Sequence, residues 1–198
     1  MNNHTTAYCL NICSAAGGGI LNGGRVTVNN STISGNYAAA YSKNLEESSF
    51  GGAISNSTST ALTLNNSTIS ENGAISNGGG ISNSGGTATF QNSIVANNSS
   101  GNCNGTITSK GYNLSSDNSC DFGNAGDLNN TDPKLGNLGN YGGPTQTILL
   151  LSGSPAIDAG NPTGCTDGHG HLLMTDQRGK PRPDKEDSGA RMNVRRTS

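Results

Sequence analysis

The chain has 198 residues, of which 30% are hydrophobic and 4% aromatic, and it contains no tryptophan. This length allows one domain, and the hydrophobic share is too small for a conventional layered core. Charged residues make up 12% and the formal net charge is −2. Charge repulsion therefore does not cause disorder here, and a general attraction to nucleic acid is not expected. A narrow core of small residues, repeated along the chain, fits this composition.

The N-terminal residues, MNNHTTAYCLNIC, form neither a basic region nor a long apolar one, so they are not a signal peptide. The most apolar run, Ile148 to Leu151, is far too short to span a membrane, and no transmembrane segment is expected. Because the repeats described next are typical of extracellular proteins, we expect this chain to lack the N-terminus of its parent protein.

Three copies of a two-part unit follow one another between residues 17 and 98. The first part reads GGGILN from Gly17, GGAISN from Gly51 and GGGISN from Gly78. The second part reads VTVNNSTISGN from Val26, LTLNNSTISEN from Leu62 and ATFQNSIVANN from Ala88. Internal repeats of this length indicate a solenoid, in which each unit buries its apolar side chains against its neighbours.

The second part of each unit has a period of two, as in Val26-Thr27-Val28, which predicts a β-strand with one buried face. Asn-Asn-Ser then breaks the strand as a turn would. Each unit thus holds about three short strands that pair with the next coil, about 4.8 Å away. The predicted fold is all-β, a right-handed parallel β-helix. Its coils are expected near 17–36, 51–72, 78–98 and 103–120, with an insertion at 37–50 that loops out.

Stacking the coils brings Asn30, Asn66 and Asn92 into one turn column. Stacked asparagine side chains can hydrogen-bond along a ladder, so we predict a ladder at these three residues. An outward column holds Thr27, Thr63 and Thr89. Regular threonine arrays on flat β-helix faces bind ordered water, but three rungs interrupted by an insertion make a poor array. Threonine is also a good outward strand residue in its own right.

The chain contains five cysteines. Cys103 and Cys120 flank a short loop, and a disulfide between them would suit an oxidising compartment. Neither this spacing nor that of Cys9 and Cys13 matches a zinc site. Residues 127–183 carry Pro, Gly-Gly and the most apolar run, and we predict that they form closing coils or a cap over the last sheet edge. A disordered tail is expected at 184–198.

The coils resemble those of bacterial right-handed β-helix proteins of the pectin-lyase-like superfamily, including polymorphic outer-membrane-protein repeats. Residues 93–183 carry more specific motifs. NSIVANNSSGNCNGTITSKGYNLSSDNSC, TDPKLGNLGNYGGPTQTILLLSGSPAIDAG and TDQRGKPRP, in this order, resemble the choice-of-anchor Q domain. The resemblance implies a secreted or surface-displayed bacterial protein and a longer parent chain. Members commonly continue with a cysteine and another strand, whereas this chain reads DKEDSGARMNVRRTS after Pro183. We therefore expect a truncation or frame change near Arg191, with the lost cysteine as the partner of Cys165.

Some members of the wider superfamily cleave polysaccharides with acidic residues beside a basic one, or with paired carboxylates. The outward positions of the repeats are Ser, Thr and Asn, so we predict no catalytic residue and no cofactor. The densest polar group holds Asp158, Asp167 and Asp176 with Arg178. These aspartates are weak candidates for a calcium or sugar site. Turn capping and an Arg–carboxylate clamp are the favoured explanation. His169 and His171 share one loop, a pattern that is more often incidental than metal-binding.

The leading hypothesis is a non-catalytic structural or adhesive module, secreted or on the cell surface (outer membrane) of a bacterium. Its expected partners are surface glycans or other surface proteins, and not nucleic acid. The alternatives are a divergent polysaccharide lyase or hydrolase and, third, an ice-binding β-helix.

Overall fold

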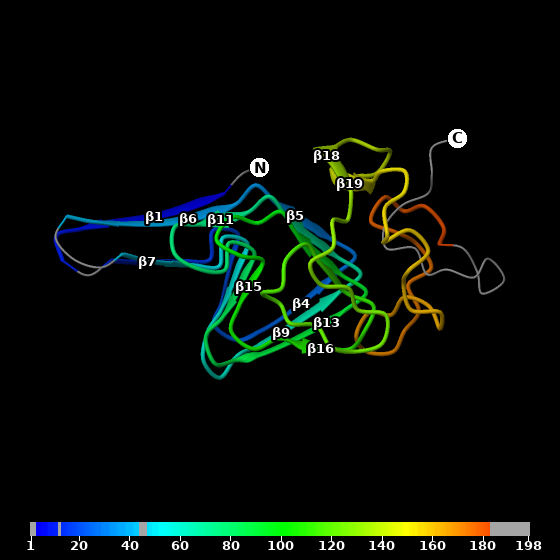
Figure 1. The fold of residues 1–198 in the computed structure, drawn as a ribbon, viewed down its shortest axis with the longest axis horizontal. Helices are drawn as coiled ribbons and strands as arrows, with labels where there is room; N and C mark the ends of the chain where they lie inside the picture. Colours follow the sequence, from blue (N-terminus) through cyan, green and yellow to red (C-terminus); the bar gives the residue numbers. More distant parts are fainter. Residues whose placement is uncertain (1–2, 12, 44–46, 183–198) are drawn as a thin grey trace.

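The computed structural model describes residues 3–11, 13–43 and 47–182. Every regular element in these ranges is a β-strand. No helix in them is long and apolar enough to cross a membrane. Strands of successive coils pair in parallel, and their ribbons follow one another closely in Figure 1. The predicted fold class is confirmed: the chain forms an all-β, right-handed parallel β-helix with a C-terminal cap.

Three sheets form the faces of the helix, and each takes one strand from each of four coils. The first sheet contains β3 (Ile20–Asn22), β8 (Ile54–Asn56), β12 (Ile81–Asn83) and β15 (Cys103–Asn104). The second sheet contains β4 (Arg25–Asn29), β9 (Ala61–Asn65), β13 (Thr87–Gln91) and β16 (Thr108–Ser109). The third sheet contains β5 (Thr32–Ser34), β10 (Thr68–Ser70), β14 (Ile94–Ala96) and β17 (Leu114–Ser115).

The register of these strands is the one that the repeats predict. Val28 pairs with Leu64 and Leu64 with Phe90, and Ile69 lies between Ile33 and Val95. The inward side chains of the second and third coils form one core and are at most 1% exposed: Ile54, Leu62, Leu64, Ile69, Ile81, Phe90 and Val95. The inward side chains of the repeated strands therefore form one narrow column.

The repeated Gly-Gly has two separate causes. The first glycine of each copy has a positive φ, which is 64° at Gly51, and a side chain is strained in this conformation. The second glycine has no room for a side chain. A Cβ on Gly52 would lie 2.2 Å from the carbonyl oxygen of Gly73 and 2.4 Å from that of Gly79. The first glycine thus allows the turn at this corner, and the second allows the backbones of neighbouring coils to lie in contact there.

The insertion predicted at 37–50 does project from the coils, but as paired strands and not as a loop. It contributes β6 (Tyr37–Ser42) and β7 (Glu47–Phe50), which pair in parallel with β1 (His4–Cys9) and β2 (Cys13–Ala16). The four strands extend from the coils as an arm (Figure 1). Small side chains pack between the two layers of the arm: Ala7, Cys9, Ala15 and Ala40. The first two coils are therefore wider than the third, where only β11 (Gly73–Ala74) continues the sheet of β1 and β6.

Asparagine ladders are present, but not at Asn30, Asn66 and Asn92. One ladder joins Asn22, Asn56 and Asn83 through amide–amide hydrogen bonds of 2.7 and 2.8 Å. A second joins Asn36, Asn72, Asn98 and Asn102 in the same way. The predicted residues occupy left-handed corners, with φ between 50° and 53°, and their side chains bond to the C-terminal segment instead. The amides that form ladders lie instead on buried residues at the ends of strands or just beyond them.

The cap begins before residue 127. Backbone N–H groups of the fourth coil donate to residues 117–128: Asn102 to the Asp117 carboxylate, Cys103 to Ser119 Oγ, Tyr112 to the Ala125 carbonyl and Ser115 to the Leu128 carbonyl. Burial would raise the pKa of Asp117, but hydrogen bonds from Ser119, Asn102 and Ser115 lower it below its ordinary value. Phe122 packs on Phe90 with ring centroids 6.1 Å apart, and a Cys103–Cys120 disulfide ties the cap to the coil. The last sheet edges are therefore covered.

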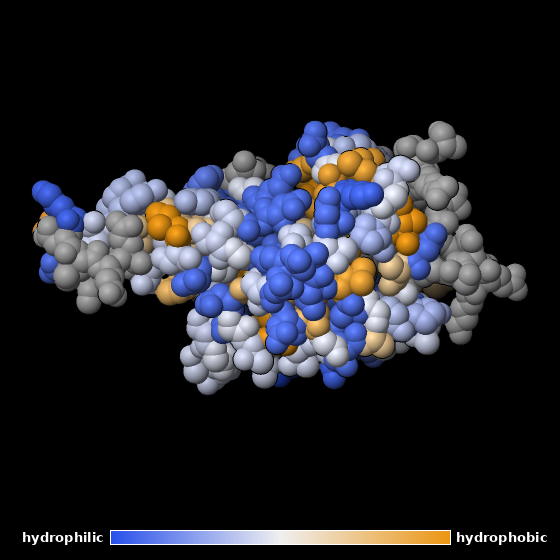
Figure 2. All heavy atoms as spheres, viewed as in Figure 1, coloured by the Kyte–Doolittle hydropathy of each residue, from blue (hydrophilic) through white to orange (hydrophobic). Residues whose placement is uncertain are grey.

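Residues 132–182 lie beside the coils, so only the first part of 127–183 caps the end. The antiparallel hairpin β18 (Leu135–Gly139) and β19 (Thr147–Leu150) belongs to a second apolar cluster on the outer side of the third sheet. This cluster contains Ile94, Ala96, Leu114, Leu128, Leu135, Leu150 and Ala156. The predicted tail at 184–198 and the expected break near Arg191 lie outside the described residues. Figure 2 shows a mainly hydrophilic face with small, separate apolar patches.

Candidate functional site

Residues 161–182, called the strap here, run back along the corner column of the coils. Asn92 Oδ1 accepts from the Asn161 N–H at 2.8 Å, and Asn66 Nδ2 donates to the Thr166 carbonyl at 2.7 Å. In the first coil, Asn30 Nδ2 donates to the Thr175 carbonyl at 3.1 Å. The three asparagines therefore anchor the strap, one in each of the first three coils.

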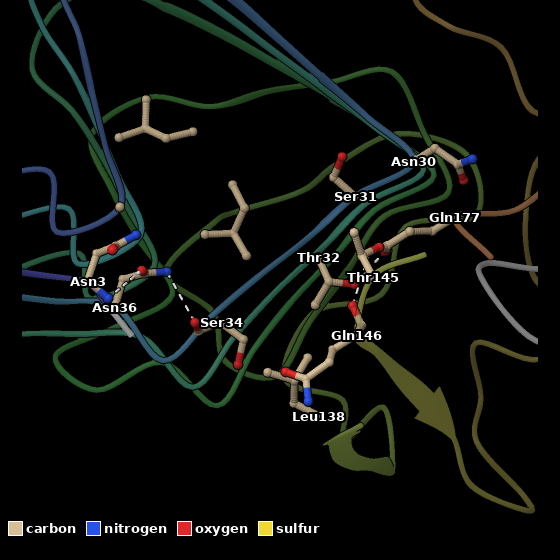
Figure 3. A pocket seen from close by; sticks show the side chains of 13 residues that line it. Asn3, Asn30, Ser31, Thr32, Ser34, Asn36, Leu138, Thr145, Gln146 and Gln177 are labelled. Carbon is tan, nitrogen blue, oxygen red and sulfur yellow. Dashed lines mark hydrogen bonds between the residues drawn. The ribbon is translucent and has the colours of Figure 1, made fainter. Parts of the chain in front are cut away.

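A cleft of about 670 Å³ opens where the first coil, the hairpin and the strap meet (Figure 3). β5 and the corner before it form one wall, and Leu138, Thr145 and Gln146 of the hairpin region lie opposite, with Gln177 of the strap between them. The lining residues are Asn3, Gly19, Ile20, Asn30, Ser31, Thr32, Ile33, Ser34, Asn36, Leu138, Thr145, Gln146 and Gln177.

Hydrogen bonds hold the walls of the cleft in place. Thr32 Oγ1 lies 2.7 Å from Gln177 Oε1, and Gln177 Nε2 donates to Thr145 Oγ1 at 3.0 Å and to the Gln146 carbonyl at 3.2 Å. Gln177 thus links the first coil to the hairpin. On the other side, Asn36 Nδ2 donates to the Ser34 carbonyl at 3.2 Å. The cleft is formed by residues more than a hundred positions apart in the chain.

The cleft is polar but uncharged. Its lining combines amide and hydroxyl side chains with the apolar Ile20, Ile33 and Leu138, and among the described residues that line it none is an Asp, Glu, Lys, Arg or His. Amides and hydroxyls both donate and accept hydrogen bonds, and apolar surface favours the C–H faces of a ligand. The arrangement is suited to binding a neutral polar ligand, and the lining offers no group that titrates near neutral pH.

No family model, curated protein or solved structure matches this chain. The function proposed below therefore depends on the geometry of the cleft.

The three candidate aspartates have separate surroundings. Asp176 is 8% exposed, and its Oδ2 accepts from Arg178 Nε at 2.9 Å and from Arg178 Nη2 at 2.6 Å, an ion pair within the strap. Asp167 pairs with His171, and Asp158 lies at an exposed turn with a φ of 58°. In the part of the chain that the structure describes, no three His, Cys, Asp or Glu side chains are grouped to hold a metal ion.

Hydrogen bonds in the turn at Asp167 lower the pKa of its carboxyl group, and this effect can be tested. The hydrogen bond with the His171 ring, at 2.8 Å, and those from the N–H groups of His169 and His171 lower the pKa of Asp167 from 3.8 to about 2. Because the pKa of Asp167 is lower in the folded chain than in the unfolded chain, the ionised carboxylate stabilises the turn. This stabilisation is fully present above about pH 3.8 and is lost as the pH falls through about 2. We expect His171→Ala to raise the Asp167 pKa toward 3.8, measured by carboxyl ¹³C NMR. An unchanged titration midpoint of Asp167 in this variant would show that the backbone N–H groups alone lower its pKa.

The outward threonine column has four members in register, because Thr108 of β16 continues Thr27, Thr63 and Thr89. The insertion does not interrupt this sheet. However, the strap approaches the column at its second member: a Cβ placed on Gly168 would be 3.4 Å from Thr63 Cγ2. Thr27 and Thr108 stay exposed, so the column is open at its two ends and approached by the strap between them.

The sequence pointed to none of the lining residues opposite β5. Gln177 lies within the TDQRG motif and Thr145 beside Gly-Gly-Pro, but no spacing in the chain connects them to Thr32. Cys165, in the strap, is buried with a free thiol whose pKa burial raises. The hypothesis of a partner cysteine past Pro183 concerns residues outside the described ranges.

Proposed function

We propose that this chain is a non-catalytic β-helix module, secreted or displayed on the surface of a bacterium, that binds neutral glycans in the cleft between β5 and the β18–β19 hairpin. The observation that carries this proposal is the lining: amide and hydroxyl groups around a small apolar patch, without a charged side chain. A sugar ring has the matching chemistry, with hydroxyl groups at its edge and C–H groups on its faces.

Two further features support this proposal. Cys103 and Cys120 form a disulfide and Cys9 is also disulfide-bonded, as is usual in proteins that leave the cytosol. One wall of the cleft is β5, which is paired with β10, and Gln177 ties this wall to the hairpin, so little order has to be gained on binding. The choice-of-anchor resemblance belongs to the same proposal, since surface display is what that family implies.

The test is a glycan-array screen of the full chain, followed by calorimetry with the neutral oligosaccharides that bind. Gln146→Ala removes the amide of an exposed lining residue, and we expect the affinity to fall about tenfold, since a lost hydrogen bond contributes about 1 kcal/mol. The matched control is Gln91→Ala, which removes an amide from β13 outside the cleft and should leave the affinity unchanged.

Polysaccharide cleavage is measured in parallel, with and without calcium, by the absorbance of unsaturated products and by reducing ends. We expect neither signal. Product formation would replace the binding proposal with the lyase or hydrolase alternative. An array on which only charged glycans bind, or none, would also contradict the proposed function.

A further inference from the structure

A second pocket, called the corner pocket here, lies on the side of the solenoid where the third sheet meets the arm. It has a volume of about 360 Å³ and is lined by His4, Gly35, Asn36, Tyr37, Glu71, Asn72, Gly73, Asn97 and Ser99. These residues come from the arm and from three successive coils, so the pocket runs along the side of the coils. Of its lining residues, only Asn36 also lines the cleft described above.

One wall of the corner pocket is a column of residues with a left-handed backbone. Gly35, Glu71 and Asn97 occupy the same position in three copies of the repeat, with φ of 72°, 59° and 58°. This conformation favours glycine and asparagine, whereas a longer side chain is strained in it. Glu71 is therefore the one of the three that the local backbone does not favour. Strained residues gather at functional sites, so the Glu71 carboxylate is a candidate ligand-binding group.

The other wall of the corner pocket carries aromatic rings. It is a column across the sheet of β1, β6 and β11, in which Tyr37 pairs with His4 on one side and with Gly73 on the other. The centroid of the Tyr37 ring lies 6.1 Å from that of His4, and a Cβ on Gly73 would be 2.7 Å from Tyr37 Cδ2. Because Gly73 has no side chain, the ring extends from the first coil to the second, which is the coil that carries Glu71.

The charge of the corner pocket is negative. Among the described residues that line it, Glu71 is the one carboxylate and none is a Lys or Arg. Glu71 is exposed, and in the described part of the chain its carboxylate has no hydrogen-bond or ion-pair partner. A protonated amine has the matching chemistry, because it donates charge-assisted hydrogen bonds to a carboxylate and is attracted to aromatic rings.

The rest of the lining selects among amines. Asn36 and Asn72 are buried and their amides are bonded to each other in the ladder, so they form a fixed floor. Asn97 and Ser99 are exposed and offer an amide and a hydroxyl group, which suit the hydroxyl groups of a sugar. An amino acid would bring its own carboxylate close to that of Glu71, and a polyamine would leave its second charge unpaired.

We propose that the corner pocket binds an amino sugar through its protonated amine, which pairs with the Glu71 carboxylate beside the Tyr37 ring. Binding there does not depend on the binding of neutral glycans in the cleft, because neither Glu71 nor Tyr37 lines the cleft. Gln146, the residue that tests the cleft, does not line the corner pocket. The two proposals can therefore fail separately.

The experiment is a titration of the full chain with chitobiose, the disaccharide of glucosamine, followed by ¹⁵N–¹H NMR. It is done at about pH 7, where histidine rings are in general largely neutral. We expect the amide signals of Gly73 and Asn97 to shift. N,N′-Diacetylchitobiose has the same rings without the charge, and it should bind at this pocket at least about tenfold more weakly. Added salt should weaken the binding of chitobiose, because exposed charges are screened.

Single substitutions test the contacts of the amine. Glu71→Gln keeps the length of the side chain and removes its charge, and we expect the affinity for chitobiose to fall about tenfold. Tyr37→Leu should lower the affinity about threefold, whereas Tyr37→Phe keeps the ring and should bind as the wild type does. The matched control is Asp121→Asn, which removes an exposed carboxylate from another left-handed residue, with a φ of 47°, outside the pocket. Its affinity should not change.

The Glu71→Asn variant separates binding from folding, because asparagine stands at this position in the third coil and suits the left-handed backbone. We expect it to unfold at a higher urea concentration than the wild type and still to bind chitobiose about tenfold more weakly. The proposal is overturned if Glu71→Gln binds like the wild type, or if the free and acetylated disaccharides bind equally. Signal shifts confined to Thr145 and Gln146 of the cleft, no shifts at all, or equally tight binding of lysine or putrescine would also overturn it.

Discussion

The Gly52→Ala variant is expected to lose about 4 kcal/mol or more of its free energy of unfolding. The added methyl group would lie 2.2 Å from the Gly73 carbonyl oxygen and 2.4 Å from that of Gly79, well inside contact distance. Because both obstacles are backbone groups of the next turn of the solenoid, no side-chain rotation relieves the overlap. The coils have to separate, which exposes the core around Ile54 and breaks the ladder on both sides.

The measurement is urea unfolding followed by far-ultraviolet circular dichroism. Gly123→Ala is the matched control, since a Cβ at Gly123 would have no neighbour within 4 Å and its φ is not positive. We expect this control to stay within about 1 kcal/mol of the wild type. Equal unfolding midpoints for Gly52→Ala and the wild type would show that the second glycine of the repeat is not a steric requirement.

The Asn56→Ala variant is expected to lose about 3 kcal/mol of stability, since two buried amides lose a partner at once. Asn56 is fully buried and stands in the middle of its ladder. Its Oδ1 accepts from Asn22 at 2.7 Å and from Thr60 at 2.8 Å, and its Nδ2 donates to Asn83 at 2.8 Å. Removing the amide leaves Asn83 Oδ1 buried without this donor and opens a space in the ladder.

The same unfolding experiment tests this prediction, with the exposed Asn118→Ala as the control, for which a change below about 0.5 kcal/mol is expected. Asn30→Ala gives a second comparison, because that side chain bonds to the strap and not to other asparagines. A smaller loss for Asn56→Ala than for Asn30→Ala would contradict the role assigned to the buried ladder.

The coils could be predicted because their pattern is local and repeated. Alternation at Val26-Thr27-Val28 and its copies determines which side chains face inward, and the copies determine the register with Leu64 and Phe90. The ladder predicted at Asn30, Asn66 and Asn92 does not form, because the repeat shows which residues align but not which way a corner residue turns its side chain. Asn30 has a left-handed backbone that turns its amide outward, and Asn56, at the end of a strand, turns inward.

The arm and the cleft could not be predicted, since their partners are not copies of one another. HTTAYC and YAAAYS share only the Ala-Tyr pair that aligns Ala7 with Ala40 and Tyr8 with Tyr41, so nothing in the repeats indicates that the insertion pairs with the N-terminal strands. The cleft depends on contacts such as Thr32–Gln177, which join positions 145 residues apart. Such contacts arise from the way in which the C-terminal segment packs on the finished coils, and no periodic signal encodes them.

The strap also changes how the solenoid can unfold. When each repeat touches only its neighbours, stability is a sum of nearest-neighbour terms, and the array frays from an end, one unit at a time. Here Asn92, Asn66 and Asn30 attach one segment to the third, second and first coils. Opening the first coil therefore also breaks contacts of the strap. Because the strap is also bonded to the second and third coils, this loss destabilises them as well. The linear array becomes a single cooperative unit, in which a segment that follows the coils in the chain secures the first of them.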